Sequence, residues 1–355
     1  MTAPGGVVAR KAGARLHGLR EFLTGAVADR GLLWPDSDDE FSSDTLAVDL
    51  DGAKLLFVAT RSHSTSREER RSTLSASVGW TFDPELDLET IEREYVGVLR
   101  DLVLFATRRR SFTTSLDLTI GDSRMATVKV VRQAALQDRD EREIYALALN
   151  LVDHDDPAAL VARWYALRGR IGPVWDIFFS ALDRPESLLE DRLLGLLAFA
   201  EGYHRALLDE RPLTRKQQKS AEKAIKGAID DPEVRAVYRR ALSHANSQTQ
   251  RDRLEVLTRR ALEVVSDWWY VDTDVFLDRL IHTRNWLIHW GKRSTGVVND
   301  SAGMVELVRG LIVVLYANLL RDLGLSVEEA GKVIGSGWRL EGMPDDVFEE
   351  GSEGD

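Results

Sequence analysis

Residues 277–291 read LDRLIHTRNWLIHWG. At about 100° of rotation per residue, the aliphatic residues of this stretch point in one direction and predict an amphipathic helix with one buried face. The residues of this stripe are Leu277, Leu280, Ile281, Leu287 and Ile288. Arg284 falls in the middle of the stripe. The adjoining face is polar, because spacings of three and four residues return to the same side of a helix. It carries Asp278, His282, Asn285 and His289.

Helical patterns surround this stretch on both sides and predict a bundle over residues 155–340. The expected helices span residues 187–208, 231–246, 250–265, 273–291 and 302–324, with Thr214 as the N-cap of one more. The apolar run GLIVVLYANLL, residues 310–320, is far shorter than the roughly 20 residues that cross a bilayer, so we expect a buried helix. The N-terminus lacks the apolar core of a signal peptide, so we expect a cytoplasmic protein without membrane contact.

Strand patterns dominate the first part of the chain. TLAVDL and KLLFVAT flank Asp51-Gly52-Ala53, which predicts a hairpin because Asp-Gly tolerates the positive φ of tight turns. Further runs rich in Val, Thr and Ile occupy residues 73–80, 112–120 and 125–131, and residues 147–152 are expected to close the sheet. Between them, residues 88–103 have helical spacing.

The fold class expected from these patterns is α+β. A β-rich domain with one embedded helix covers residues 1–154, and an all-α bundle covers residues 155–340. The polar stretch DHDDPAA at residues 153–159 marks the boundary between them. Residues 341–355 carry seven acidic residues and no basic residue, which predicts a mobile tail.

Composition excludes several classes of site. The 355 residues include no cysteine, which rules out disulfides, thiolate zinc sites and a cysteine nucleophile. The net charge of −11 is unevenly distributed, since residues 211–263 hold thirteen Lys and Arg against seven Asp and Glu. This segment is compatible with a local basic surface for nucleic acid and equally with solvated helix faces.

An arginine on a buried stripe requires a carboxylate or a phosphate as partner. Glu201, which also interrupts an apolar helix, is the carboxylate that an internal ion pair would use. The neighbours of Arg284 suggest a phosphate instead. The arginine donates to phosphate oxygens, His289 can transfer a proton near neutral pH, and Asn285 can orient either group.

The sequence RNWLIH, residues 284–289, resembles the arginine, polar residue and histidine signature of HEPN domains, a helical class with many metal-independent ribonucleases. The helical half resembles the Apea-like HEPN domain, with LLGLLAFAEGYHRAL, residues 193–207, similar to its first long helix and glutamate. The β-rich half is similar to the ApeA-type N-terminal domain.

This resemblance implies that Arg284 and His289 are the catalytic pair and that Asn285 orients them. It implies an endoribonuclease without metal or other cofactor, in which a ribose 2′-hydroxyl attacks the adjacent phosphodiester. It also implies a homodimer and a role in antiviral abortive infection or stress, with a phage or cellular trigger sensed by the N-terminal domain. The alternative is a non-catalytic HEPN scaffold that binds RNA, nucleotide or a partner protein.

Glu201 and His282 are expected to support this site, and Lys292 and Arg293 to extend its cationic edge toward RNA. The two basic residues are also explained by the helix dipole, which favours cations at a C-terminus. Trp268, Trp269, Trp286 and Trp290 are expected to pack in the core or at a dimer interface rather than to stack on bases.

Two other site chemistries are disfavoured. Asp278 with His282, or His282 with His289, could share a metal, but a protein zinc site takes at least three ligands and no HExxH pattern is present. GKRS at residues 291–294 has the lysine of a P-loop, but Trp286 replaces its first glycine and Arg293 its Ser or Thr.

Overall fold

The structure is a computed structural model, and it describes most of the chain in two compact units. The described residues are 8–24, 41–65, 70–108, 111–120, 127–130, 149, 151, 154–184, 187–208, 213–245, 248–266, 269, 271–289 and 295–338. Unit 1 comprises Met1–Gly169 with Arg321–Asp355, and unit 2 comprises Arg170–Leu320. The boundary expected at residues 154 and 155 stays a prediction, and the expected acidic tail lies outside the described residues.

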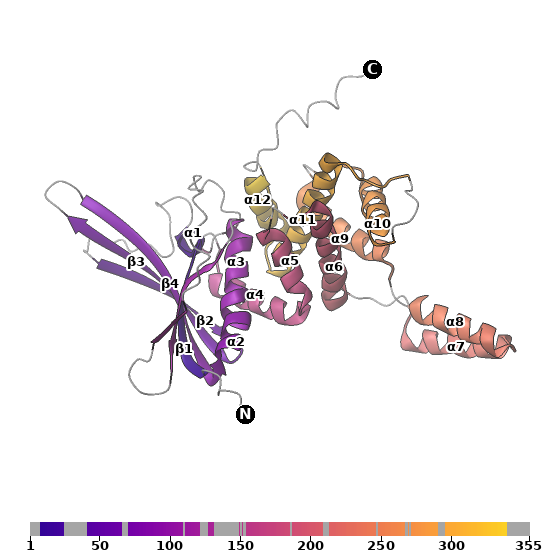
Figure 1. The fold of residues 1–355 in the computed structure, drawn as a ribbon, viewed down its shortest axis with the longest axis horizontal. Helices are drawn as coiled ribbons and strands as arrows, with labels where there is room; N and C mark the ends of the chain where they lie inside the picture. The colour runs from indigo at the N-terminus through magenta and orange to yellow at the C-terminus, as the bar shows by residue number, and fades with distance from the viewer. Residues whose placement is uncertain are drawn as a thin grey trace, which may run out of the picture. The chain divides into compact units, whose positions relative to one another are not determined.

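Unit 1 contains an antiparallel sheet of six described strands in the order β2-β3-β4-β1-β5-β6, of which β1, β2, β3 and β4 are labelled in Figure 1. The strands are β1 (Val8–Leu16), β2 (Phe41–Leu50), β3 (Ala53–Thr65), β4 (Arg70–Asp87), β5 (Thr113–Thr119) and β6 (Thr127–Val130). The predicted hairpin is confirmed, because Leu50 pairs with Ala53 and Gly52 has a φ of 69°. In the parts of β3 and β4 whose side chains are described, buried residues alternate along each strand, with Leu55 and Phe57 on β3 and Val78 and Trp80 on β4.

Strand β1 was not predicted from the sequence, although it lies between β4 and β5 within the sheet. Its buried residues Ala12, Ala14 and Leu16 alternate with less buried ones, which is the period of a strand with one covered face. Two of the three are alanines, and Gly13 and Arg15 stand between the buried positions, so the run carries little strand signal.

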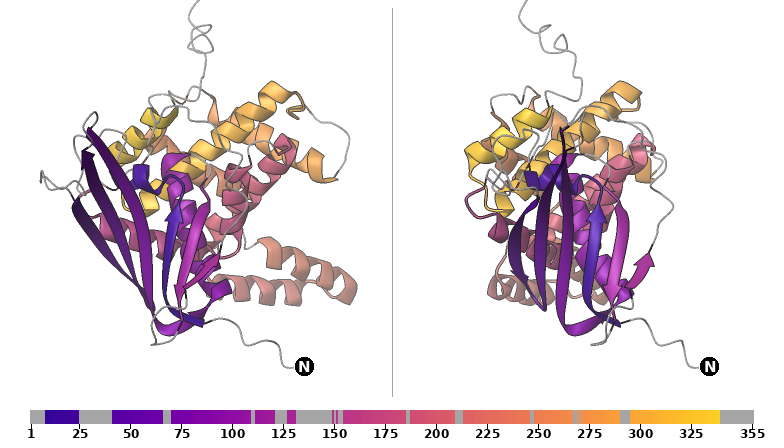
Figure 2. Two further views of the ribbon diagram at one scale, coloured as in Figure 1. Left: turned by 60° about the vertical axis from the view of Figure 1, so that its left-hand side comes forward. Right: turned by 90° about the vertical axis from the view of Figure 1, so that its left-hand side faces the viewer.

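The embedded helix forms one continuous helical run that lies against the sheet (Figures 1 and 2). It comprises α2 (Leu88–Thr90), the π-helix η1 (Ile91–Val96) and α3 (Gly97–Thr107), so the helix expected over residues 88–103 is confirmed. Helix α4 (Pro157–Ile171) packs on it, since Trp164 Nε1 donates to Val98 O at 2.8 Å and the Trp164 ring contacts Phe105. Two shorter helices, α1 (Leu19–Thr24) and α12 (Val327–Trp338), belong to the same unit.

The strand expected over residues 147–152 is not formed by the residues described there. Leu149 and Leu151 are both buried and belong to no strand, and the Leu149 backbone N–H donates to Ala106 O at the end of α3 at 3.1 Å. Leu149 and Leu151 are therefore buried without forming a strand. The sequence did not reveal this, because an aliphatic run alone does not distinguish a strand from another buried segment.

Unit 2 is helical, as predicted. Its helices are α5 (Val174–Asp183), α6 (Leu189–Leu207), α7 (Arg215–Ala228), α8 (Pro232–Ala245), α9 (Gln250–Val265), α10 (Thr273–His289) and α11 (Ser301–Asp322), whose last residues pass into unit 1. Thr214 caps α7 through a capping box with Gln217, as its position predicted. The expected α+β fold class is thus confirmed.

Helix α11 forms the centre of this unit. By length and composition it could cross a membrane, but 72% of its apolar window is buried inside the fold, as expected for a core helix. Asn318 on this helix is fully buried, and its Nδ2 donates to Leu257 O of α9 at 2.9 Å. The helices around α11 therefore provide a fixed base for α10, which carries the proposed site.

Candidate functional site

Helix α10 is held against the bundle through its first half. Phe276, Leu277 and Leu280 are buried, and the helix contacts α6 and α9. Gly310 of α11 lies opposite Phe276, where an added Cβ would come within 2.7 Å of Phe276 Cε2. The absence of a side chain at residue 310 therefore lets the two helices approach closely around the Phe276 ring.

The second half of α10 departs from the apolar stripe expected from its sequence. Leu287 and Ile281 are only half-buried, and Ile288 is 43% exposed. The prediction that Ile288 belongs to the core is wrong, because the buried face of α10 ends near Thr283 and the last turns lie at the surface. Arg284 consequently lies at the edge of the buried face, half-buried, and not in its middle.

Arg284 and Asn285 are bonded to each other. Arg284 Nη1 donates to Asn285 Oδ1 at 3.0 Å, while Glu201 pairs with Arg205 on its own helix. Among the described side chains, the Arg284–Glu201 ion pair considered from the sequence is therefore not formed. Within the described part of the chain, Asn285 is the partner of the Arg284 side chain, and its remaining guanidinium donors can bind an anion.

Asn285 and His289 share the solvent-facing side of α10, and both are exposed. His289 is the last residue of the helix. Asn285 and His289 thus lie on a polar face beside Arg284, as the helical spacing predicted. Nothing from the described part of the chain covers either side chain enough to bury it.

His282 lies on the same face but is half-buried. The loop after α10 lies close to it, since an added Cβ at Gly296 would stand 3.3 Å from His282 Cδ2. Buried Thr283 holds this loop, because Thr283 Oγ1 accepts a hydrogen bond from the Val298 N–H at 3.0 Å. His282 is therefore enclosed by the fold to a degree that Asn285 and His289 are not.

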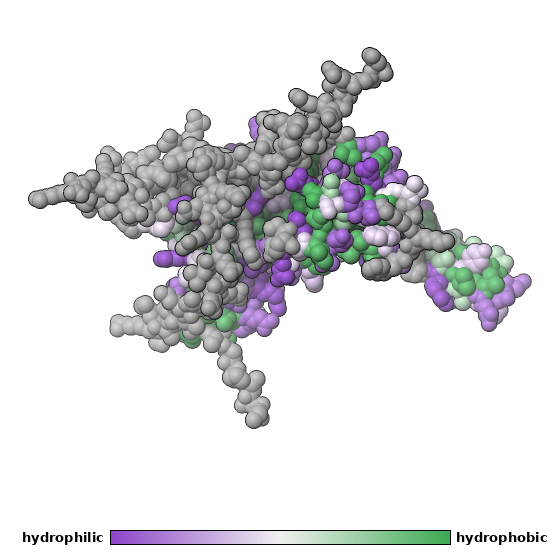
Figure 3. Space-filling view, turned by 45° about the horizontal axis from the view of Figure 1, so that its top comes forward, coloured by the Kyte–Doolittle hydropathy of each residue, from purple (hydrophilic) through white to green (hydrophobic). Residues whose placement is uncertain are grey.

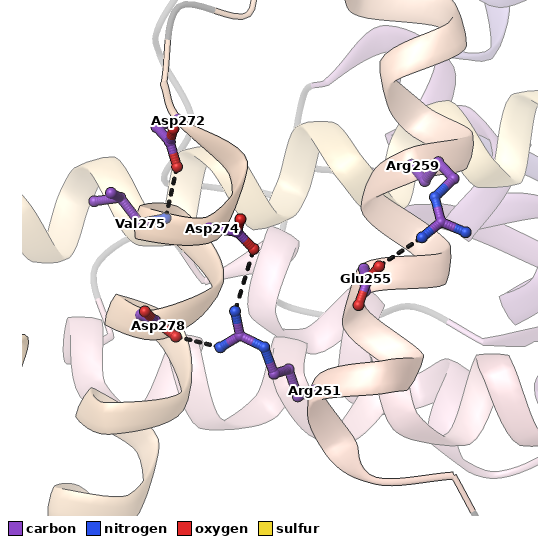
Figure 4. A network of polar contacts seen from close by, with 7 residues as sticks. All are labelled: Arg251, Glu255, Arg259, Asp272, Asp274, Val275 and Asp278. Atoms are coloured by element: carbon purple, nitrogen blue, oxygen red, sulfur yellow. Dashed lines mark hydrogen bonds and ion pairs between the residues drawn. The ribbon is translucent and has the colours of Figure 1, made fainter.

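Asp278, one turn before His282, is bound by Arg251 in the first turn of α9 (Figure 4). Arg251 also donates to Asp274 Oδ1 at 3.3 Å, so it joins the two acidic residues of α10 that are four apart. The hydrogen bond to Asp278, with the charges of both carboxylates, raises the pKa of Arg251. This cluster holds α9 against α10 and occupies the carboxylate that a metal at His282 would need.

Comparison with known families places the α10 helix in a recognised domain. Residues 194–329, which run from within α6 to the first turn of α12, match the Apea-like HEPN family. Residues 194–329 are an Apea-like HEPN domain. HEPN domains have nuclease or nucleotide-binding roles. No curated protein and no solved structure matches the chain.

Within this HEPN domain, the tryptophans near α10 are only partly described. The Trp269 ring meets Phe276 edge-on with centroids 5.2 Å apart, which agrees with the predicted packing role, and Trp286 is half-buried. Trp268, Trp290, Lys292 and Arg293 lie outside the described residues, so the cationic edge expected from Lys292 and Arg293 stays a prediction.

Two residues of the HEPN domain were not recognised from the sequence. Arg251 joins α9 to α10, and Thr283 holds the loop over His282. The spacing of Asp274 and Asp278 signals that a basic partner faces them, but not which of the many arginines it is. The described side chains include no group of three or more potential metal ligands.

Proposed function

We propose that this chain is a metal-independent endoribonuclease that acts in the cytoplasm as a homodimer through its HEPN domain, in antiviral abortive infection or a stress response. The observation that carries the proposal is the placement of Arg284, Asn285 and His289. The arginine is oriented by the asparagine through a 3.0 Å hydrogen bond, and the histidine is exposed at the end of the same helix.

The proposed reaction needs a proton carrier and a cation. The ribose 2′-oxygen attacks the adjacent phosphorus as its proton passes to an imidazole, and the bond from phosphorus to the 5′-oxygen breaks as that oxygen takes a proton. The products are a 2′,3′-cyclic phosphate and a 5′-hydroxyl. In this scheme His289 moves the proton, and Arg284 stabilises the charge that develops on the phosphate oxygens.

Glu201 and His282 have lesser roles in this proposal. Glu201 is paired with Arg205 and acts through the packing of α6, and half-buried His282 maintains the face on which Asn285 and His289 lie. The sensing of a phage or cellular trigger by unit 1 remains part of the proposal. A scaffold that binds RNA or nucleotide without cutting it would use the same arginine for phosphate binding.

The deciding experiment compares the purified full-length protein with Arg284→Ala, His289→Ala and His282→Ala on single-stranded RNA in excess EDTA. We expect wild type to cut RNA and to leave an all-deoxy strand intact. The first two substitutions should each slow cleavage by at least about a hundredfold, the usual scale for losing a positioned proton carrier or charge-stabilising group. His282→Ala should cause only a modest loss.

Three results would overturn the ribonuclease: loss of cleavage in EDTA, equal cleavage of DNA, or a His289→Ala protein as active as wild type. The scaffold would replace it if all the variants fold and none of the proteins cuts RNA, yet RNA binding depends on Arg284.

A further inference from the structure

The basic residues of helix α7 all lie on one side of that helix. They are Arg215, Lys216, Lys219, Lys223 and Lys226, and all five are exposed. At about 100° per residue they fall within an arc of about 100°, and the first and last are about 16 Å apart along the axis. We call these five residues the α7 basic face.

The opposite side of α7 packs on α8. Its half-buried residues are Gln218, Ala221 and Ile225, with spacings of three and four, and the two helices form a hairpin (Figure 1). The basic face is therefore directed away from the only extensive contact that α7 makes among the described elements. Figure 3 shows hydrophilic and hydrophobic surface side by side on this hairpin.

No internal charge neutralises the basic face within the described part of the chain. Glu222, the one acidic residue of α7, accepts a hydrogen bond from Gln218 at 3.4 Å, and none of the five cations forms an ion pair there. Five like charges on three turns of helix repel one another at a cost to the helix. An external polyanion would relieve that repulsion.

The turn between α7 and α8 is held by several hydrogen bonds. Asp231 Oδ1 accepts hydrogen bonds from Glu233 N and Val234 N at 2.8 and 3.2 Å. Arg235 donates to Ile229 O through both Nε and Nη2, at 2.8 and 2.6 Å, and so closes the turn between the helices. The basic face is thus presented by an ordered element, and little entropy is lost when a ligand binds.

The hairpin is inserted between two helices of the bundle that contact α10. It leaves the bundle after α6 and returns at α9, whose first turn holds Arg251 on Asp278 of α10. Asp278 shares the outer face of α10 with His289, eleven residues and about 16 Å further along the helix. A single RNA strand a few nucleotides long can span the distance from Asp278 to His289.

We propose that the α7 basic face binds the sugar-phosphate backbone of the RNA that the HEPN site cleaves, an inference that rests on the proposed function. Four of the five residues are lysines, which are depleted at protein–protein interfaces, and the face carries no aromatic or aliphatic anchor. Phosphate contacts of this kind position a strand without reading its sequence. The hairpin thus supplies affinity, and α10 supplies the chemistry.

The test measures binding of a fluorescent single-stranded RNA to the full-length His289→Ala protein over a series of salt concentrations. A triple substitution of Lys219, Lys223 and Lys226 by Gln removes three charges from the basic face. Glutamine has nearly the helix propensity of lysine, so α7 should stay folded, which circular dichroism will check. The matched control replaces Lys11, Arg15 and Lys54 by Gln, removing the same charge from exposed positions on the sheet of unit 1.

RNA affinity falls as salt rises, and we expect this dependence to be weaker in the α7 triple variant. The slope of log affinity against log salt should be less steep by about 2, the value for three lost phosphate contacts on a single strand. The control should keep the parent slope. Equal slopes and affinities for the α7 variant and its parent, the His289→Ala protein, would overturn the inference. If the wild type still cuts RNA, the proposed ribonuclease would then stand without the basic face.

If the His289→Ala protein binds no RNA, the inference about the basic face fails, and the ribonuclease is still judged by cleavage with the wild type. If the parent instead binds polyglutamate and the α7 variant does not, the face belongs to an acidic protein and the inference is overturned. Loss of RNA binding in the α7 variant, together with a wild type that never cuts RNA, would support the basic face while removing the ribonuclease.

Discussion

Arg284 and Asn285 are consecutive residues of α10, and the guanidinium of one donates to the amide oxygen of the other at 3.0 Å. Consecutive residues on a helix point about 100° apart, so the bond draws the arginine from the edge of the buried face toward the solvent-facing side that carries His289. The amide oxygen satisfies one donor of Arg284 and carries no charge that would compete with a phosphate.

This relationship predicts different outcomes for two substitutions of Asn285. Asn285→Ala should reduce RNA cleavage about tenfold, because it removes an orienting group that transfers no proton. Asn285→Asp should reduce cleavage further, because a carboxylate beside Arg284 forms an ion pair and repels the phosphate. Steady-state cleavage rates of the two purified variants measure the difference. An Asp variant faster than the Ala variant would show that Asn285 does not act through Arg284.

A second prediction concerns the number of chains at the site. Arg284 and His289 are five residues apart, so their Cα–Cβ directions diverge by about 140° around α10, which favours a site in which the two groups come from different chains. We expect light scattering to give a dimer, in which two α10 helices contribute to one cleft. A mixed dimer of Arg284→Ala and His289→Ala chains retains one copy of each group. It should cut RNA several-fold faster than either variant alone.

Two tagged variants expressed together and purified through both tags would provide the mixed dimer. A monomer with full cleavage activity, or a mixed dimer no faster than its parents, would contradict the two-chain site.

The sequence predicted the residue types of the site better than their surroundings. Helical periodicity correctly grouped Asp278, His282, Asn285 and His289 on one face, because that grouping follows from the geometry of one helix. It also placed Ile288 in the core, but in the structure this side chain is 43% exposed. Periodicity gives the direction of a side chain but not where along its length the helix leaves the bundle.

The same limit applies to the fold. Capping residues such as Thr214 act within one turn, so the helix starts near them were predictable. The partner of Asp278 is Arg251, on another helix and 27 residues away, and only the tertiary arrangement of α9 and α10 selects it from the surrounding arginines. Strand β1 was missed for a related reason, since its small residues are buried by the neighbouring strands and the helix above them.

A third prediction concerns the packing beneath α10. Gly310→Ala would place a Cβ 2.7 Å from Phe276 Cε2 and 3.1 Å from its Cζ, and Phe276, only 4% exposed, cannot move into solvent. We expect a loss of about 1–3 kcal/mol in unfolding free energy, the usual cost of overpacking. Gly227→Ala in α7 is the matched control, because nothing lies within 4 Å of its added Cβ. It should stabilise its helix by about 0.5–1 kcal/mol.

Chemical denaturation followed by circular dichroism gives both values. Equal stability of the Gly310→Ala protein and wild type would mean that α10 and α11 separate readily around Phe276.

A fourth prediction concerns pH and the start of α9, the helix that holds Arg251. Thr249 and Asp252 form a capping box, in which the Asp252 N–H donates to Thr249 Oγ1 and the Thr249 N–H donates to Asp252 Oδ2 at 2.8 Å. Hydrogen bonds from the Thr249 side chain and backbone lower the pKa of Asp252. A carboxyl whose pKa is lowered by folding stabilises the fold above its ordinary pKa of about 4, and this stabilisation is lost as the pH falls through the lower folded value.

Asp252→Asn should therefore lower the unfolding temperature at neutral pH, and the gap to wild type should narrow as the pH falls below about 4. Thr249→Ala, which removes the other half of the box, should cost about 1 kcal/mol at neutral pH. The matched control is Asp191→Asn, at the same distance from the start of α6, where Leu188 is the N-cap and makes no side-chain cap bond. Thermal unfolding of both variants is followed by circular dichroism. The comparison separates the effect of the capping box on stability from the general effect of a charge near a helix N-terminus. If the two variants fall below wild type in unfolding temperature by the same amount at every pH, the capping box adds nothing to the stability that the charge alone provides.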